Sequence, residues 1–358
     1  METKVISISR EDAEDSGLKE AAEILRRGGL VAFPTETVYG LGANALDEQA
    51  SSKIYAAKGR PSDNPLIAHI ADIADLPPLV AEIPEAGRRL MEAYWPGPLT
   101  MIFRKSSLVP RTTTGGLDTV AVRMPDDAIA GRLIRLAGVP VAAPSANMSG
   151  RPSPTRADHV YQDMNGRIEM IIDGGPVGIG VESTIVDVTG NVPVLLRPGA
   201  VTVEMLRSTV GEVEIDPAIS GPVKPDMKPK APGMKYRHYA PRAELTLVED
   251  REYTGKAVSR RVVDTICSLA ADCMAGGRRA GIICTDETKD CYPREAEIRS
   301  LGRRSQEETI AHNLFGVLRE FDSLGVDEIY SESFSGENLG RAIMNRLTKA
   351  AGYRIKKV

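Results

Sequence analysis

The 358-residue sequence has few of the residues that most metal, redox and disulfide sites need: four cysteines, four histidines and one tryptophan. The cysteines are Cys267, Cys273, Cys284 and Cys291. They form no C-x-x-C pair and the histidines are scattered, so we expect reduced thiols and neither disulfides nor a protein-held metal. The phosphate-binding pattern GxxxxGK[ST] is also missing. A Walker-type nucleotide site is therefore excluded, and any ATP must be bound in another way.

Long apolar runs and an excess of positive charge are absent as well. Residues 1–17 lack the basic and apolar regions of a signal peptide, and no apolar run approaches the length of a membrane span. We therefore expect a cytoplasmic protein that does not associate with a membrane. The net charge of −4 gives no overall attraction to nucleic acid, so any contact with RNA would have to be local.

The length, with 42% hydrophobic residues, is sufficient for two domains. We predict a first α/β domain over residues 1–212, a proline-rich segment over 213–242 and a second domain over 243–358. In the second domain, short apolar runs alternate with helical patterns, which is typical of a small parallel-sheet, Rossmann-like domain. The runs lie at 245–248, 281–284, 298–301 and 328–331, and the helical patterns near 257–275, 305–321 and 338–350.

A polar loop over residues 144–155 follows the apolar run 139–143 and precedes a helical pattern. It places Ser145, Asn147 and Ser153 among glycine and prolines. Hydroxyls and main-chain N–H groups in such a loop suit a phosphate or another small polar ligand. A merely connective loop remains the alternative on local grounds.

Residues 34–42 form a second polar stretch at the exit of a predicted strand over 30–33. Residues 40–45 within it fit the dinucleotide pattern GxGxxA. That pattern should open a helix directly after the strand, whereas Pro34 and a Thr-Glu-Thr run intervene, and the next helix begins near Asp47. A nicotinamide site is therefore the weaker interpretation.

Four cations stand at places that suggest an anionic ligand. Lys58 and Arg60 follow the helix that begins near Asp47, in a segment that two prolines make rigid. Their alternative role is to complement the negative end of the helix dipole. Arg123 and Arg197 lie within predicted strands, where an arginine is either the partner of an anion or a solvated charge at a sheet edge.

The proline-rich segment carries Lys235, Tyr236, Arg237 and Tyr239 near its end. A plain spacer has little use for two aromatic and two cationic side chains so close together. We predict that the segment docks on the site as a lid, with a passive spacer as the alternative.

Five motifs stand in a fixed order along the first domain: PTETVYGL (34–41), KGRPSDNPL (58–66), WPGPLT (95–100), PSANMSGRPSPT (144–155) and ESTIVD (182–187). Together they closely resemble the L-threonylcarbamoyladenylate synthases. The segment PGMKYRHYAP (232–241) and the domain after it are similar to the long two-domain form of that family. The resemblance covers nearly the whole chain.

The resemblance implies a nucleotidyltransferase that converts ATP, L-threonine and bicarbonate into threonylcarbamoyladenylate and diphosphate. The adenylate is the precursor for modifying adenosine beside the tRNA anticodon, and a later enzyme transfers it to tRNA. Direct contact with tRNA stays open. The implied first domain is a twisted, open, mixed sheet with a concave basic face. Mg²⁺ would be carried by ATP, in agreement with the lack of a carboxylate cluster.

The resemblance also implies the site residues. Those expected to be catalytic are Lys58, Arg60 and Arg197. Those expected to bind threonine are Thr35, His69, Arg123 and Ser183. Those expected to bind ATP are Lys58, Arg60, Asn64, Thr119, Ser145, Asn147, Ser153, Arg197 and Tyr239. The chemistry agrees, because a carbamate that attacks a phosphate brings two anions together and needs fixed cations.

Two alternatives belong to other classes of protein. A double-stranded-RNA-binding module would share a basic face, but the net negative charge and 4% aromatic content give it no support. An enzyme that transfers a carbamoyl group from carbamoyl phosphate could share the first domain.

Overall fold

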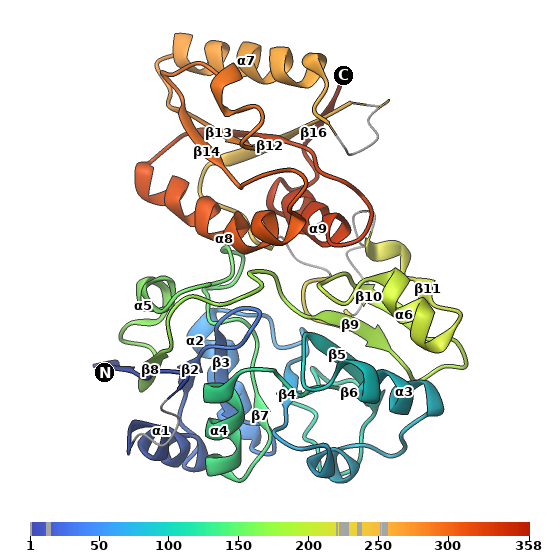
Figure 1. Cartoon of the computed structure of the whole chain (residues 1–358). Helices are drawn as coiled ribbons and strands as arrows, with labels where there is room; N and C mark the ends of the chain where they lie inside the picture. Colours follow the sequence, from blue (N-terminus) through green and yellow to red (C-terminus); the bar gives the residue numbers. More distant parts are fainter. Residues whose placement is uncertain are drawn as a thin grey trace. The chain divides into compact units, whose positions relative to one another are not determined.

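The computed structural model describes residues 2–11, 16–219, 221, 229–234, 238–250, 252 and 257–358. The chain divides into two compact units (Figure 1). The first unit comprises Met1–Ser149 and Ser153–Lys235, and the second comprises Gly150–Pro152 and Tyr236–Val358. The described residues between 213 and 234 thus belong to the first unit. The predicted domain limits at 212 and 242 stay a prediction, and Lys235, Tyr236 and Arg237 lie outside the described residues.

The described residues of the first unit form an 11-stranded sheet in the order β1-β8-β2-β3-β7-β4-β6-β5-β9-β10-β11. The strands are β1 (Lys4–Ser7), β2 (Val31–Phe33), β3 (Gly40–Asn44), β4 (Ile67–His69), β5 (Leu99–Arg104), β6 (Thr119–Arg123), β7 (Val141–Ala142), β8 (Met170–Asp173), β9 (Thr184–Asp187), β10 (Val194–Arg197) and β11 (Glu214–Ile215). Because β4 and β6 pair in parallel and β5 and β6 pair antiparallel, the predicted mixed sheet is confirmed.

Helices and short 3₁₀ turns connect these strands. The helices are α1 (Ser16–Arg26), α2 (Glu48–Lys58), α3 (Glu85–Tyr94), α4 (Ala128–Ala137), α5 (Ala157–Met164) and α6 (Val203–Val210), and the 3₁₀ turns are η1 (Ile73–Asp75), η2 (Pro77–Leu79) and η3 (Pro217–Ile219). Asp47 caps α2 as predicted, because its side chain accepts the N–H groups of Gln49 and Ala50. Residues 40–44 are a strand, so the GxGxxA pattern does not open a helix as a dinucleotide site requires.

The strand register places the predicted polar residues of the sheet on one face. Arg123 lies opposite both His69 and Thr100 in the neighbouring strands. Since side chains alternate along a strand, Thr119 and Arg123 point to the same face of β6. Ile185 of β9 pairs with Thr100 of β5 on one side and with Arg197 of β10 on the other, so Arg197 lies in register with Thr100. The opposite face is apolar and is covered by α2, α3, α5 and α6.

Two apolar clusters lie on the polar face beside these residues. One is formed by α1 and α4 against β2 and β8. The other combines sheet residues with residues from the proline-rich segment, and consists of Ile67, Ile102, Ala121, Ile185, Leu196, Ala218, Ala231 and Met234. We call this second group the cover cluster. The described part of the proline-rich segment is therefore packed on the same face as Arg123.

The second unit contains a five-stranded sheet in the order β14-β13-β15-β12-β16. Its strands are β12 (Glu244–Glu249), β13 (Ala280–Cys284), β14 (Glu297–Ser300), β15 (Glu328–Glu332) and β16 (Ile355–Lys357). Its helices are α7 (Arg260–Ala275), α8 (Glu307–Leu324) and α9 (Gly340–Ala350), with a 3₁₀ turn η4 (Lys289–Cys291). All pairs are parallel, so the predicted parallel-sheet α/β domain is confirmed. Helix α7 covers one face of the sheet, and α8 and α9 cover the other (Figure 1).

The four cysteines are free thiols. Among the described helices, none combines the length and the apolar character needed to cross a membrane. The described residues also contain no group of three or more histidine, cysteine, aspartate or glutamate side chains arranged to hold a metal ion.

Candidate active site

Lys58 ties helix α2 to the polar loop after β7. Its side chain is buried, and Nζ donates hydrogen bonds of 2.5 Å to the carbonyl oxygens of Ser145 and Asn147. Ser145 Oγ donates to Asn147 Oδ1, also at 2.5 Å. Gly59 ends the helix at φ 61°, a left-handed conformation that glycine adopts without strain. Lys58 is therefore a buried, positioned ammonium group and not a solvated one.

Arg60 is fixed by the rigid segment that follows it. Its Nε donates to the carbonyl oxygen of Asn64 at 3.2 Å, and its Nη2 donates to that of Pro65 at 2.9 Å. The side chain of Asn64 is almost completely buried, and its Oδ1 accepts no hydrogen bond from the described residues. Buried amide oxygens normally have a partner, so this acceptor is suited to an N–H group of a ligand.

Arg123 is the centre of a buried polar cluster and not a sheet-edge charge, because β6 lies between β4 and β5. Its Nη1 donates to Thr37 Oγ1 at 2.9 Å, and its Nε donates to the carbonyl oxygen of Gly97 at 3.3 Å. Thr37 Oγ1 is also 2.9 Å from Thr35 Oγ1. The predicted threonine-site residues Thr35 and Arg123 are thus joined through Thr37.

Sequence reasoning missed Glu36, which forms an ion pair with Arg123 at an N–O distance of 2.6 Å. Neither carboxylate oxygen of Glu36 accepts a hydrogen bond from the described residues. A signal was available, since Glu36 stands between two threonines at a strand exit. The partner could not be identified from the sequence, because Arg123 is distant along the chain.

His69 lies beside Arg123 at the end of β4. It is buried, and its Nδ1 lies 3.1 Å from the carbonyl oxygen of Ile67. Burial, reinforced by the nearby positive charge of Arg123, lowers the pKa of His69 to about 3. The imidazole is therefore neutral at physiological pH. It can take part in hydrogen bonds but adds no charge to the site.

Ser183 and Arg197 form a second cluster on the same face. Arg197 donates from Nε to the carbonyl oxygen of Ser183 at 3.0 Å and from Nη2 to Ser183 Oγ at 3.1 Å. Ser183 Oγ also lies 2.7 Å from Thr100 Oγ1. Arg197 Nη1 reaches the carbonyl oxygen of Pro232, in the proline-rich segment, at 3.5 Å. Thr100 and Pro232 are two neighbours that sequence reasoning did not assign to the site.

Ser153 is buried and donates a short hydrogen bond to Oε1 of Glu182. Glu182 directly precedes Ser183 and was also missed. This contact connects the loop over residues 144–155 with the segment that begins β9.

Two predicted ATP-binding residues lie apart from these contacts. Thr119 opens β6, opposite Arg104, and its side chain takes part in none of the interactions above. Tyr239 belongs to the second unit, where its ring packs on Phe315 at 5.3 Å and under the guanidinium of Arg346 at 5.8 Å. The predicted roles of Thr119 and Tyr239 at ATP, and that of Tyr239 in a lid, stay predictions.

The first unit thus presents positioned cations and hydroxyl groups without a metal cluster among its described residues. Lys58, Arg60, Arg123 and Arg197 supply the cations, and each is held by hydrogen bonds to main-chain carbonyl oxygens. Such an arrangement suits anionic substrates whose charges must be brought together. The fold and these side chains define a two-domain α/β protein with a cationic candidate site in its first unit.

The comparisons with known proteins identify the family. Residues 23–199 match a family model described as Telomere recombination, and residues 201–352 match one described as Threonylcarbamoyl-AMP synthase, C-terminal domain. The threonylcarbamoyl-AMP synthase of Pyrococcus abyssi is 51% identical over 99% of this chain and 100% of its own length. That of Bacillus subtilis is 49% identical over 95% of this chain and 94% of its own.

A crystal structure of P. abyssi Sua5 complexed with L-threonine is also similar, with a TM-score of 0.90 and 49% sequence identity. The match covers 99% of this chain and 100% of that one. The chain belongs to the threonylcarbamoyl-AMP synthase family, in its long form with two domains.

Proposed function

We propose that the first unit makes threonylcarbamoyl-AMP and diphosphate from ATP, L-threonine and bicarbonate, as the family relationship implies. The observation that carries this proposal is the set of fixed cations, Lys58, Arg60, Arg123 and Arg197, in a chain 51% identical to a synthase of that name. ATP and threonine follow from the name of the relatives and from the threonine complex. Bicarbonate is the carbon source that the carbamoyl group requires.

The reaction explains why cations predominate. Threonine's amino group first takes up CO₂ derived from bicarbonate and becomes a carbamate. A carbamate oxygen then attacks the α-phosphorus of ATP, the new O–P bond forms, and the bond from this phosphorus to the β-phosphate oxygen breaks, so that diphosphate leaves with the electron pair. Two anions meet in this step, and preorganised positive charges lower its barrier. Mg²⁺ would arrive with the triphosphate and neutralise part of its charge.

The cluster around Arg123 suits threonine. A guanidinium matches a carboxylate in two-pronged geometry, so Arg123 would hold the α-carboxylate. Glu36, with two acceptor oxygens beside Arg123, would accept hydrogen bonds from the amino group. Thr35, His69 and Ser183 would then discriminate the side-chain hydroxyl.

The remaining cations suit ATP. Lys58 fixes the carbonyl groups of Ser145 and Asn147, whose loop has main-chain N–H groups and hydroxyls for phosphate. Arg60 and Arg197 would neutralise charge at the α-phosphate and the leaving diphosphate. Asn64, Thr119, Ser145, Asn147, Ser153 and Tyr239 would complete the ATP contacts.

The packing of the proline-rich segment supports the lid proposal. Ala218, Ala231 and Met234 are buried in the cover cluster, on the face that carries Arg123 and Arg197. A segment held there is well placed to exclude water from a labile mixed anhydride. Lys235, Tyr236 and Arg237, which follow directly, would supply the contacts of the lid.

The product would serve a later, tRNA-modifying step. A separate enzyme in the cytoplasm would transfer the threonylcarbamoyl group to adenosine in tRNA, and whether tRNA touches this chain is a separate question. The RNA-binding module and the carbamoyl-phosphate enzyme are less favoured, because neither requires the buried polar cluster around Arg123, which suits an amino acid.

Mass spectrometry of the products tests the proposal. Incubation with ATP, threonine and bicarbonate should give a species with the mass of threonylcarbamoyl-AMP, together with diphosphate. Formation of ADP and phosphate alone would contradict the proposal. Consumption of carbamoyl phosphate in place of bicarbonate would favour the carbamoyl-transfer alternative.

A further inference from the structure

The sheet of the second unit has a crevice at the carboxyl ends of its central strands. β13 and β15 are neighbours, and the chain leaves them in opposite directions. From β13 it continues to β14 at one edge of the sheet, whereas from β15 it passes over β12 to β16 at the other edge. The loops after such strands diverge, and this opening is where parallel α/β sheets bind small ligands.

A cavity of about 670 Å³ lies at the carboxyl ends of these strands. Described residues that lie after each of β12, β13, β14 and β15 line it, namely Val258, Thr288, Arg304 and Ser335 in that order. The volume falls within the range of small-molecule sites, about 300–1,000 Å³. The cavity thus has the size and the place in the fold of a ligand site, and it uses none of the residues assigned to the first unit's reaction.

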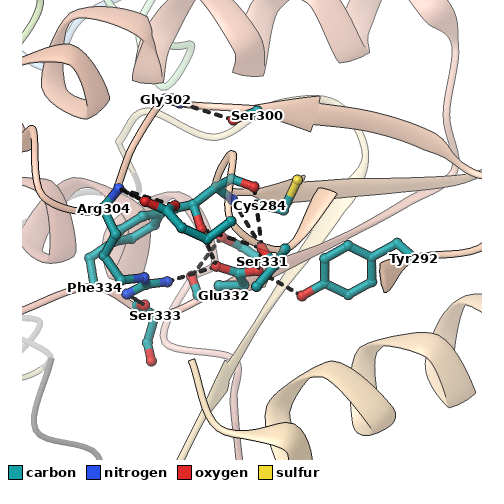
Figure 2. A network of polar contacts seen from close by, with 12 residues as sticks. Cys284, Tyr292, Ser300, Gly302, Arg304, Ser331, Glu332, Ser333 and Phe334 are labelled. Carbon is teal, nitrogen blue, oxygen red and sulfur yellow. Dashed lines mark hydrogen bonds and ion pairs between the residues drawn. The ribbon is translucent and has the colours of Figure 1, made fainter. Parts of the chain in front are cut away.

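A buried ion pair lies beside the cavity: Arg304 lines it, and its partner Glu332 does not (Figure 2 shows the contacts of this pair). Glu332, at the end of β15, is completely buried and accepts a hydrogen bond of 2.7 Å from Arg304 Nη2. It also accepts from Tyr292 Oη at 2.7 Å and, by a short contact, from Thr288 Oγ1. Arg304 Nη1 donates to the carbonyl oxygen of Ser333 at 2.9 Å. Removing such a pair from water costs free energy, so a buried pair need not stabilise the fold. Its role here is to hold the Arg304 side chain in place.

Arg304 is rigidly placed by these contacts and by Phe334, whose ring centroid lies 5.0 Å from its Cζ. Its positive charge is already matched by Glu332. The guanidinium therefore supplies a flat, oriented surface in the wall.

The other charged residues that line the cavity, among those that the structure describes, are acidic. They are Glu287, Glu307 and Glu337. Glu287 accepts the main-chain N–H of Arg304, and Glu307 accepts that of Gly340 at 3.0 Å. Burial raises the pKa of Glu307, and the nearby charges of Glu308 and Glu337 raise it further. Among the described lining residues, negative charge therefore exceeds positive charge, and a phosphate group would be repelled.

We propose that this cavity binds a small ligand that carries several O–H or N–H donors and no negative charge. The carboxylates and the hydroxyl groups of Ser305 and Ser335 supply the acceptors for such a ligand. Two sources share this chemistry: the neutral diol of a nucleoside, and an organic amine such as a polyamine. The site is independent of the reaction proposed for the first unit.

The test is calorimetric titration of the full-length protein with adenosine, with spermidine and, separately, with AMP. Two variants address the cavity. Glu337→Gln removes a lining charge without a change of shape, and Ser305→Trp fills the cavity from an exposed position. The matched control is Glu308→Gln, which makes the same change of charge on α8 outside the lining. Thermal unfolding of each variant establishes that it is folded.

We expect adenosine or spermidine to bind with a saturable isotherm that weakens by about tenfold or more in Glu337→Gln and in Ser305→Trp, but not in Glu308→Gln. Any binding of adenosine or AMP in the first unit is the same in the unsubstituted protein and the three variants. A difference between their isotherms therefore measures binding in the cavity. If the two cavity variants lose only adenosine binding, the ligand is of the diol type. If they lose only spermidine binding, the ligand is an amine. The proposal is overturned if neither ligand distinguishes the four proteins, or if AMP binds this cavity as tightly as adenosine.

Discussion

Glu36 and Arg123 come from separate strand exits of the first unit, and Oε2 of Glu36 lies 2.6 Å from Nη2 of Arg123. Both side chains are largely buried, and the other contacts of the guanidinium go to Thr37 and Gly97. The carboxylate, in contrast, accepts no hydrogen bond from the described residues. This pair is complementary to an amino acid, because the guanidinium can bind its carboxylate and the carboxylate of Glu36 can accept hydrogen bonds from its amino group.

Glu36→Gln should raise the KM for threonine by about tenfold or more, because a hydrogen bond to a charged acceptor is replaced by a weaker one. The same change should leave inhibition by 2,3-dihydroxybutanoate, which lacks the amino group, nearly unaltered. Steady-state kinetics with both compounds tests this pairing. Glu82→Gln, at an exposed residue, serves as the control. Equal losses for the two compounds would place Glu36 away from the amino group.

Arg123→Lys should raise the KM for threonine much more than the KM for ATP. Lysine keeps the positive charge but lacks the two-pronged geometry, and it cannot reach both Thr37 and Gly97 as the guanidinium does. Measurement of both KM values in the same preparation separates the two substrates. An effect confined to ATP would assign Arg123 to the phosphates.

Arg60→Ala should lower kcat by about a hundredfold or more, the scale of one preorganised electrostatic contact in a transition state. The carbonyl groups of Asn64 and Pro65 would lose their donor at the same time, so thermal unfolding must be measured beside the rate. Arg104→Ala, at an exposed residue of β5, is a suitable control for charge. A rate that stays within about threefold would leave Arg60 with only the role of a helix-end charge.

His69 should make the first unit sensitive to acid. Its pKa in the folded state is about 3, whereas an unfolded histidine has a pKa of about 6.5, so the unfolded state binds the additional proton. Stability is therefore complete above about pH 6.5 and is lost as the pH falls from there toward 3. His69→Asn should show a smaller decrease in Tm between pH 7 and pH 5 than the unsubstituted protein. His312→Asn, in the second unit, is the control, and an identical decrease in all three proteins would contradict this role.

A chain that ends at Gly211 should make less threonylcarbamoyl-AMP and lose more of it to hydrolysis. It lacks β11 and the residues Ala218, Ala231 and Met234, so the sheet side of the cover cluster becomes exposed. Replacement of Lys235, Tyr236 and Arg237 by alanine in the full chain isolates the lid contacts from this packing. Tyr239 is retained, because its ring packs on Phe315 in the second unit. If the triple variant matches the unsubstituted protein in rate and product retention, the segment is a spacer.

The sequence alone was sufficient for most helices and strands. The helix predicted to begin near Asp47 coincides with α2, which Asp47 caps. The strand β3 was not predicted, because its two glycines and a short apolar run look like a loop. Its partners β2 and β7 provide the hydrogen bonds that its local propensity does not favour.

The site was harder to predict from the sequence, because the burial and the partners of its side chains depend on the order of strands in the sheet. The sequence around Lys58 is typical of a surface charge at a helix end. The side chain is buried because the loop that carries Ser145 and Asn147 packs on it and accepts its hydrogen bonds. Arg123 is interior because β5, far along the chain from β4, lies on its other side. Glu36 had no distinguishing pattern of its own, since its significance comes from a partner that only the fold supplies.

In the proposed reaction, a carbamate formed from threonine and bicarbonate attacks ATP on the polar face of the first unit. Isotopically labelled bicarbonate tests it most directly. With ATP, threonine and labelled bicarbonate, mass spectrometry should show the label in threonylcarbamoyl-AMP, and diphosphate release should stop when either threonine or bicarbonate is omitted. An unlabelled product, or diphosphate release that continues at the same rate without threonine, would contradict the account.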